Sequence, residues 1–175
     1  VGKRELKNLP IIGPLMGAAG VVFIDRSDRR AAIETMKPLV KVMQEEKKSL
    51  VIAPEGTRAP TRKLGAFKKG GFHVAIQSSL PIVPVVIHNS GDISPKGGKI
   101  FRSGTVHVDI LPAIQTTNWS VANIDEHVAE VRNAFLRALG QPELSAEETA
   151  KARRDTPDDL KPEVRGRRSE PRLKK

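Results

Sequence analysis

The sequence predicts an α/β fold in which a mixed, mostly parallel sheet is flanked by helices on both faces. Within residues 20–88, three short apolar runs are separated by two stretches whose apolar residues recur at helical spacing. The order strand, helix, strand, helix, strand is typical of a parallel sheet with crossover helices. The apolar runs are continuous rather than alternating, as expected of strands that are covered on both faces.

The first expected strand comprises residues 20–25 and is followed by a helix. Ser27 and Asp28 are suited to the cap and the acidic first turn of that helix. Its apolar face would consist of Ile33, Met36, Val40 and Met43. Because proline lacks an amide hydrogen and clashes with the preceding turn, Pro38 should kink or divide this helix.

Residues 50–53 form the second expected strand, and residues 66–79 form the second helix. Gly70 and Gly71 weaken this helix, although a glycine pair near a helix start can also let the backbone approach a ligand. Residues 82–88 form the third strand. Pro84 lies inside it, which predicts a bulge or an edge position because proline cannot donate a ladder hydrogen bond.

The remaining sequence predicts a loop over residues 89–103, a half-exposed strand over 105–111 and an amphipathic helix that starts at Asn123. Glu126 is placed as a capping-box partner of Asn123, and Gly140 should end the helix. The apolar stripe of that helix is Ile124, Val128, Val131, Phe135 and Leu139.

The composition changes after the last amphipathic helix. Residues 1–140 are expected to form one domain, and residues 141–175 are expected to be a charged, largely disordered tail. Within the tail, residues 143–154 suit a solvated helix. From Thr156 onward the chain is too polar to bury a core, and this segment ends in two basic clusters.

Charge and composition limit the function classes. The chain has no cysteine and four scattered histidines, which excludes a disulfide framework and a thiolate metal site and argues against zinc. No metal or cofactor is expected. The net charge is +10, and residues 1–140 contribute 20 Lys and Arg against 12 Asp and Glu. Such a surface favours anionic partners: nucleic acid, anionic lipid headgroups or phosphorylated metabolites.

An uncharged run near the start covers residues 9–24 and contains Pro10 and Pro14. At 16 residues it is shorter than the roughly 20 that a spanning helix needs. It therefore suits a buried loop and strand, or a segment that enters a membrane interface.

The most informative segment is Pro54-Glu55-Gly56-Thr57-Arg58, which follows the second expected strand. No acidic residue occurs from Gly56 to Gly91, although five lysines and arginines do. In a parallel sheet, the carboxyl ends of strands share one edge, where ligands usually bind. Arg26 and Arg58 would then converge on one anion, since guanidinium groups match phosphate oxygens.

Other residues of this segment suit the same site. Gly56 would let the backbone close on the ligand. Lys68 or Lys69 would add positive charge at the start of the following helix. The plainer alternatives are that Arg26 is solvated and that Glu55 and Arg58 form a local ion pair that shapes a turn.

The same residues resemble a known family. Residues 54–58, followed by Phe67-Lys68-Lys69-Gly70, are similar to the signature block of the glycerolipid acyltransferases, with the 1-acylglycerol-3-phosphate acyltransferases as the nearest group. Three further blocks agree in order and extend the resemblance over residues 1 to about 115. They are Lys3-Arg4-Glu5-Leu6 with Pro10, Gly13 and Pro14; residues 20–26; and residues 80–87.

The resemblance implies a reaction and a set of substrates. An acyl chain would move from acyl-CoA or acyl-carrier protein to the free 2-hydroxyl of lysophosphatidate, which gives phosphatidate in phospholipid biosynthesis. Arg26 and Arg58 would hold the glycerol phosphate, and Lys68 would add charge. Glu55, Gly56 and Thr57 would shape that pocket. The protein would work at an anionic membrane surface, on the cytoplasmic face.

The chain departs from the family pattern in one respect. In the family, a His-x4-Asp motif transfers the proton, with the histidine as general base. Here the residues five positions after the four histidines are Ser78, Ile93, Pro112 and Arg132. We therefore expect a fragment of the acyltransferase domain whose catalytic pair lies before Val1, with no catalytic residue in this chain and no turnover by it alone.

Three rival hypotheses remain open. One is a member of the same family with another lysolipid acceptor. The second is a basic protein that binds membrane surfaces without chemistry. The third is a nucleic-acid-binding module, which we do not expect because one Trp, no Tyr and five Phe offer few stacking surfaces.

Overall fold

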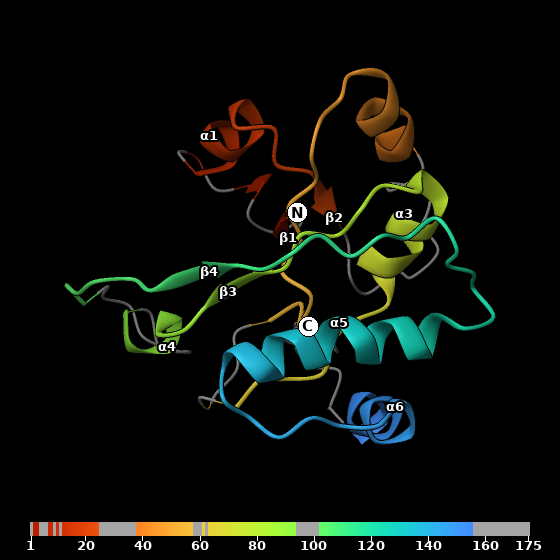
Figure 1. Cartoon of the computed structure of the whole chain (residues 1–175). Coiled ribbons are helices and arrows are strands. Elements are labelled where there is room, and N and C mark those ends of the chain that lie inside the picture. The colour runs from red at the N-terminus through yellow and green to blue at the C-terminus, as the bar shows by residue number, and fades with distance from the viewer. Residues whose placement is uncertain are drawn as a thin grey trace, which may run out of the picture.

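The computed structural model describes residues 2–3, 7–8, 10, 12–24, 38–57, 61, 63–93 and 102–155. Its helices are α1 (Ile12–Ala18), α3 (Gly70–Ser78), α4 (Ser90–Ile93), α5 (Ile124–Ala138) and α6 (Ala146–Asp155), with a further helical segment at residues 38–45. Its strands are β1 (Gly2–Lys3), β2 (Phe23–Ile24), β3 (Val85–Ile87) and β4 (Val108–Ile110). Figure 1 shows α5 between α3 and α6, with the β3–β4 ribbon extending to one side.

The described strands form two separate pairs rather than one mostly parallel sheet. β1 and β2 pair in parallel, and β3 and β4 pair antiparallel. The prediction of a strand at residues 50–53 is wrong, because this segment pairs with no other strand among the described residues. A run of β-favouring residues becomes a strand only where a partner strand meets it. Here Ile52 instead contacts helix α3, where a Cβ on Gly71 would come within 3.2 Å of its Cδ1.

Gly71 therefore has a packing role rather than the ligand approach that the sequence suggested. Helix α3 also starts later than expected, at Gly70 instead of residue 66, so residues 64–69 belong to the preceding loop. The glycine pair consequently lies at the first turn of the helix. The expected helix after residue 27 is described only from residue 38 onward, and its predicted cap lies outside the described residues.

The β3–β4 ribbon contains the irregularity that Pro84 predicts. Val85 pairs with Ile110, but Ile82 forms an isolated bridge with Ile114. Two residues, 83–84, therefore lie opposite three residues, 111–113, which is the register of a bulge. Pro84 is buried, and its carbonyl accepts a hydrogen bond from the amide of Leu111.

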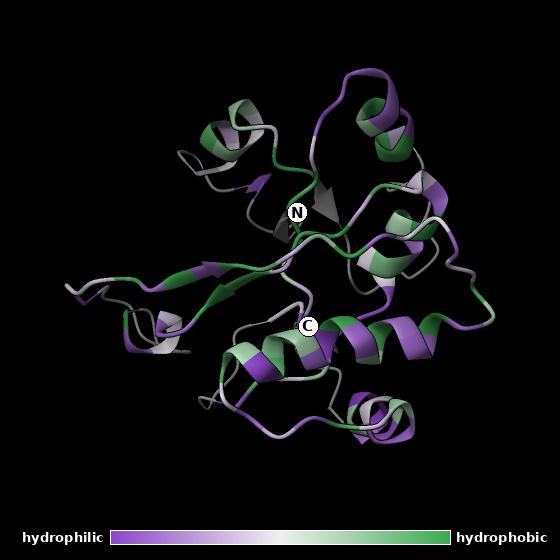
Figure 2. Ribbon diagram, in the orientation of Figure 1, coloured by the Kyte–Doolittle hydropathy of each residue, from purple (hydrophilic) through white to green (hydrophobic). Residues whose placement is uncertain are grey.

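One face of this ribbon is apolar and open to solvent. The side chains on it alternate along both strands and are between 46% and 74% exposed: Val83, Val85, Ile87, Val106, Val108 and Ile110. Figure 2 shows the ribbon as mainly hydrophobic. Val86 points to the opposite face and is 1% exposed, so this pair of strands covers the core on one side only.

The core lies between α5 and the segment that leads into α3. Phe67 and Val128 are completely buried at its centre. Around them lie Phe72, Ile124 and Val131, with Leu64, Ile76, Ile82, Ile114, Trp119 and Phe135 packed at the edge. The ring of Phe67 meets Phe135 edge-on at 5.3 Å, a favourable aromatic geometry. The expected apolar stripe of α5 therefore faces this core.

The ends of α5 confirm one prediction and correct another. The helix ends at Ala138, and Gly140 follows with a positive φ of 63°. Asn123 occupies the cap position, but its side chain makes no capping bond. Its Oδ1 instead accepts hydrogen bonds from the amide and hydroxyl of Ser120, so the expected capping box with Glu126 is wrong.

Helix α6 is the solvated helix that the sequence predicts in the tail. A capping box starts it: the Ser145 hydroxyl accepts from the amide of Glu148, whose carboxylate accepts from the amide of Ser145. This helix lies against α5. The division at residue 140 stays a prediction, and the tail from Thr156 lies outside the described residues.

Candidate functional site

The signature segment forms a loop that is closed at its base. The amide of Lys68 donates to the carbonyl of Pro54 at 2.8 Å, which joins the two ends of residues 54–68. The chain turns at Gly56, whose φ of 72° favours glycine, and the Gly56 amide donates to the carbonyl of Ala53 at 3.1 Å. The backbone therefore brings Lys68 next to Glu55 although thirteen positions separate them in the sequence.

Glu55 makes a second closure inside the loop. Its Oε2 accepts a hydrogen bond from the amide of Gly65 at 2.8 Å. Burial raises the pKa of the Glu55 carboxyl, while the Gly65 bond and the charge of Arg132 act in the opposite direction. The carboxylate is thus turned into the protein, where it shapes the loop.

Gly65 is the residue that makes this contact possible. A Cβ built on it would lie 2.5 Å from Glu55 Oε2, closer than real Cβ atoms come to other atoms. Any larger residue would have to displace the carboxylate. Glycine at position 65 therefore leaves room for the Glu55 carboxylate at its hydrogen bond.

Arg132, on α5, reaches the same loop from the other side. Its Nε donates to the carbonyl of Gly65 at 3.1 Å, and its Nη2 donates to the carbonyl of Leu64 at 2.9 Å. The residue is 5% exposed. Burial lowers the pKa of its guanidinium, while the negative charge of Glu55 acts to raise it. Its Nη1 is buried without a hydrogen-bond partner among the described residues.

Sequence reasoning did not identify Arg132 as part of the site. A signal was available, because Arg132 lies four positions after Val128 and directly after Val131, both on the buried stripe of α5. A charged residue at a buried position of an amphipathic helix is nearly always paired. The pattern could not reveal that the partners are two loop carbonyls.

Lys69 has a structural role. Lys69 Nζ forms an ion pair with Asp125 Oδ2 at 2.9 Å, and Arg153 Nη1 lies 2.8 Å from Asp125 Oδ1. Asp125 thereby links the start of α3, the first turn of α5 and α6. Lys69 is therefore held in this structural pair, and a role of Lys68 in binding a ligand stays a prediction.

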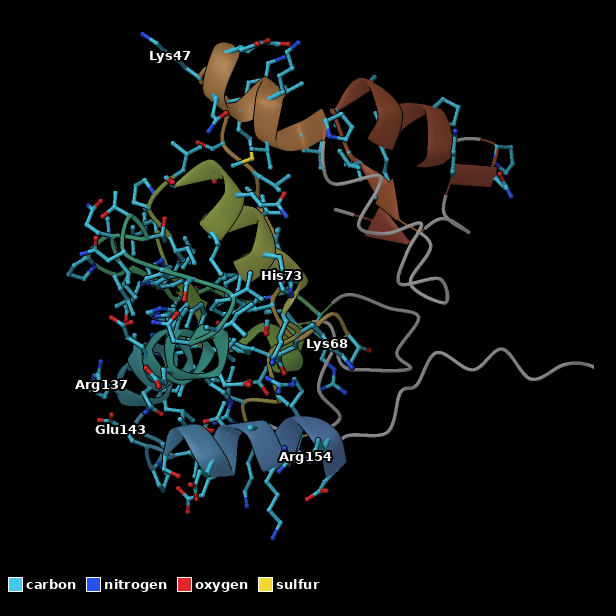
Figure 3. The ribbon with its side chains drawn as sticks, turned by 90° about the vertical axis from the view of Figure 1, so that its right-hand side faces the viewer. Lys47, Lys68, His73, Arg137, Glu143 and Arg154 are labelled. Atoms are coloured by element: carbon cyan, nitrogen blue, oxygen red, sulfur yellow. The ribbon has the colours of Figure 1, made fainter. Side chains whose placement is uncertain are left out.

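The structure describes four of the six predicted site residues. Glu55, Gly56, Thr57 and Lys68 all belong to the closed loop, and Thr57 is exposed. Arg26 and Arg58 lie outside the described residues, so their convergence stays a prediction. Figure 3 shows Lys68 and His73 on one side of the molecule and Arg137 with Glu143 on the other.

Within the described part of the chain, no group of acidic and histidine side chains is arranged to hold a metal ion. An open hollow of about 410 Å³ lies beside α5 and is lined by Leu111, Pro112, Ile114, Glu130, Ala134, Arg137 and Ala138. None of the four described site residues lines it. No helix in the described ranges has the length and apolarity to cross a membrane.

The chain belongs to the acyltransferase family. A family model described as Acyltransferase matches residues 1–88, which includes the loop of Glu55 and its closing residue Lys68. Arg132 lies outside the matched residues. The resemblance that the sequence motifs indicate is thereby confirmed.

The chain is similar to curated proteins of this family. The chain is 40% identical over 139 residues to a 1-acyl-sn-glycerol-3-phosphate acyltransferase of Limnanthes douglasii, covering 79% of the chain and 50% of that protein. It is also 40% identical over 140 residues to the protein of that name from Saccharomyces cerevisiae, covering 78% and 46%. The chain thus spans about half the length of these relatives.

A solved structure shares the fold. The crystal structure of the 1-acyl-sn-glycerophosphate (LPA) acyltransferase PlsC from Thermotoga maritima superposes with a TM-score of 0.65 at 25% identity. The match covers 79% of this chain and 54% of that protein. The described residues therefore share the fold of this acyltransferase, although their strands form two short pairs and not the mostly parallel sheet that the sequence predicts.

Proposed function

We propose that this chain is part of an O-acyltransferase that acylates the 2-hydroxyl of lysophosphatidate to give phosphatidate. The observation that carries the proposal is the closed loop of residues 54–68, which joins the signature residues to Lys68. The names of the relatives support lysophosphatidate as the acceptor. The acyl donor would be acyl-CoA or acyl-carrier protein.

The chemistry follows from the two substrates. The 2-hydroxyl oxygen attacks the thioester carbonyl, the C–S bond breaks, and the hydroxyl proton ends on the released thiol. A general base is needed for the first step and typically contributes about 10²–10⁴-fold to the rate. No histidine of this chain is followed five positions later by an aspartate. This chain would therefore bind the acceptor and would not transfer the proton.

In the proposed pocket, Arg26, Arg58 and Lys68 bind the phosphate group. Glu55, Gly56 and Thr57 set the shape of the loop that presents them. Phosphate carries up to two negative charges near neutral pH, and arginine forks bind its oxygens in pairs. A lysolipid without phosphate would not make these charge-assisted hydrogen bonds, so it should bind more weakly.

A binding comparison tests this proposal. The 175-residue chain is titrated with lysophosphatidate and with a monoacylglycerol of the same chain length, below the micelle concentration. We expect tighter binding of lysophosphatidate, and a loss of about tenfold or more in Arg58→Ala and in Lys68→Gln. The matched control is Arg154→Gln, an exposed cation near the end of α6 (Figure 3). Equal affinity for the two lipids would refute the phosphate pocket.

Activity is the second test. In an acylation assay of the protein expressed from its complete gene, Arg58→Ala should lower kcat/KM for lysophosphatidate by about tenfold or more. Comparing lysophosphatidate with lysophosphatidylethanolamine as acceptor distinguishes the proposed reaction from that of a relative that uses another lysolipid. Preference for the zwitterionic acceptor would assign the chain to that second group.

We also propose that the protein works at an anionic membrane surface, because its acceptor resides in a bilayer and its net charge is +10. Sedimentation with vesicles of phosphatidylcholine, with and without phosphatidylglycerol, tests this. Binding should require the anionic lipid and should weaken as salt is raised. Equal binding to both vesicle types would refute the electrostatic part of the proposal.

A further inference from the structure

Arg132 and Glu55 both form hydrogen bonds with the backbone of Gly65. The carboxylate of Glu55 accepts from the amide of Gly65, while Arg132 donates to the Gly65 carbonyl and to the preceding carbonyl of Leu64. Residues 64–65 of the loop are thereby fixed from two elements. Without Arg132, two carbonyls in a part-buried position would lose their donors.

The hydrogen bonds of this cluster form a chain across the loop. They run from α5 through Arg132 to Gly65, and from Gly65 to Glu55, the second residue of the signature block. The loop ends are tied separately, by the bond from Lys68 to Pro54. The segment that carries Gly56 and Thr57 is therefore bounded by fixed points on both sides.

We propose that Arg132 is a positioning residue of the candidate phosphate site, which it serves by fixing the loop of residues 55–68 without contacting the ligand. Its buried position prevents direct contact with a bound lipid. The statement that this loop binds phosphate rests on the proposed function, but the statement that Arg132 fixes the loop does not. The proposal also extends the site to α5, beyond the matched residues 1–88.

Arginine suits this position better than lysine. The guanidinium presents several donors in a fixed plane, so one side chain can donate to two successive carbonyls. A lysine has a single nitrogen on a flexible stem and keeps the positive charge opposite Glu55 without the fork. Arg132→Lys therefore separates the geometric contribution of Arg132 from its charge.

Hydrogen exchange of the 175-residue chain tests the positioning role. In Arg132→Lys, the Gly65 amide and its loop neighbours should exchange about tenfold faster or more, whereas the amides of α6 should not change. In Arg132→Gln, which keeps one donor nitrogen but loses the charge, these amides should exchange at least as fast as in Arg132→Lys. The control is Arg137→Gln, on the same helix, whose side chain is exposed and pairs with Glu143.

Ligand binding gives the second measurement. Lysophosphatidate should bind Arg132→Lys about fivefold to tenfold more weakly than the wild type, while the affinity for a monoacylglycerol stays the same. A purely structural residue would weaken both lipids together. Unchanged exchange at Gly65, or equal losses for the two lipids, would overturn the positioning role. Wild-type protein that does not prefer lysophosphatidate would instead refute the proposed function, and the exchange data alone would then decide whether Arg132 fixes the loop.

Discussion

Lys69 and Asp125 form an ion pair that joins the start of α3 to the first turn of α5, with 2.9 Å between Nζ and Oδ2. Arg153 of α6 approaches the other oxygen of the same carboxylate at 2.8 Å. One acidic side chain therefore connects three helices. The Nζ of Lys69, the neighbour of Lys68, is therefore held at the start of α5.

Asp125→Asn should destabilise the protein by about 1 kcal/mol at pH 7, because two cations lose a charged partner that is only partly shielded from water. The Lys69 bond, followed by Arg153, lowers the pKa of Asp125 below its ordinary value. The stabilisation is therefore present above pH 3.8 and is lost as the pH falls through the lowered pKa.

Urea denaturation of the wild type and Asp125→Asn at pH 7 and at pH 3 measures this difference, which should shrink at the lower pH. Glu143→Gln serves as the control, since it breaks an exposed ion pair with Arg137 and should cost under about 0.5 kcal/mol. A difference that is the same at both pH values would show that the Asp125 charge does not contribute.

Phe67→Ala should be among the most destabilising single substitutions in the described core, at about 3–5 kcal/mol. The ring is completely buried and meets Phe135 edge-on. Phe67 also precedes Lys68, so loss of the ring would loosen the loop closure. Thermal unfolding measures the effect, and Val51→Ala, at an 81% exposed position, should change stability by less than about 0.5 kcal/mol.

The sequence predicted the helices and the signature loop better than the sheet. Helix α5 follows from its apolar stripe and from Gly140, both local signals. The segment 50–53 looked like a strand because its residues favour one, but pairing depends on partners far away in the chain. Register and sheet composition are therefore not contained in the local pattern.

In the candidate site, too, local sequence signals predict some residues, whereas contacts between distant parts of the chain are not predicted. Glu55, Gly56 and Thr57 are adjacent in the sequence, and a motif can identify them together. Arg132 lies 67 positions after Gly65, and only the packing of α5 brings it to the loop. Its one local signal, a charge on a buried stripe, indicates that a partner exists but does not identify it.

Gly65→Ala should destabilise the protein by about 1–3 kcal/mol, because the added methyl group would displace the Glu55 carboxylate from its hydrogen bond. Gly70→Ala is a matched control on the neighbouring helix. A Cβ on Gly70 meets no atom within 4 Å, and alanine favours the helix by up to about 1 kcal/mol. The two substitutions should therefore change the unfolding free energy in opposite directions, and a stabilising Gly65→Ala would contradict the contact.

Glu55→Gln should reveal a pH dependence opposite to that of Asp125. Burial raises the pKa of Glu55 above 4.5, so the folded state holds this proton more tightly than the unfolded state. The contribution of Glu55 to stability is therefore greatest below pH 4.5 and falls as the pH rises through the raised pKa.

Glutamine carries no charge, and its amide oxygen can still accept from Gly65. Relative to the wild type, Glu55→Gln should gain stability between pH 4 and pH 8 in urea titrations. A relative loss over that range would mean that the charge interaction with Arg132, rather than burial, dominates at this carboxylate.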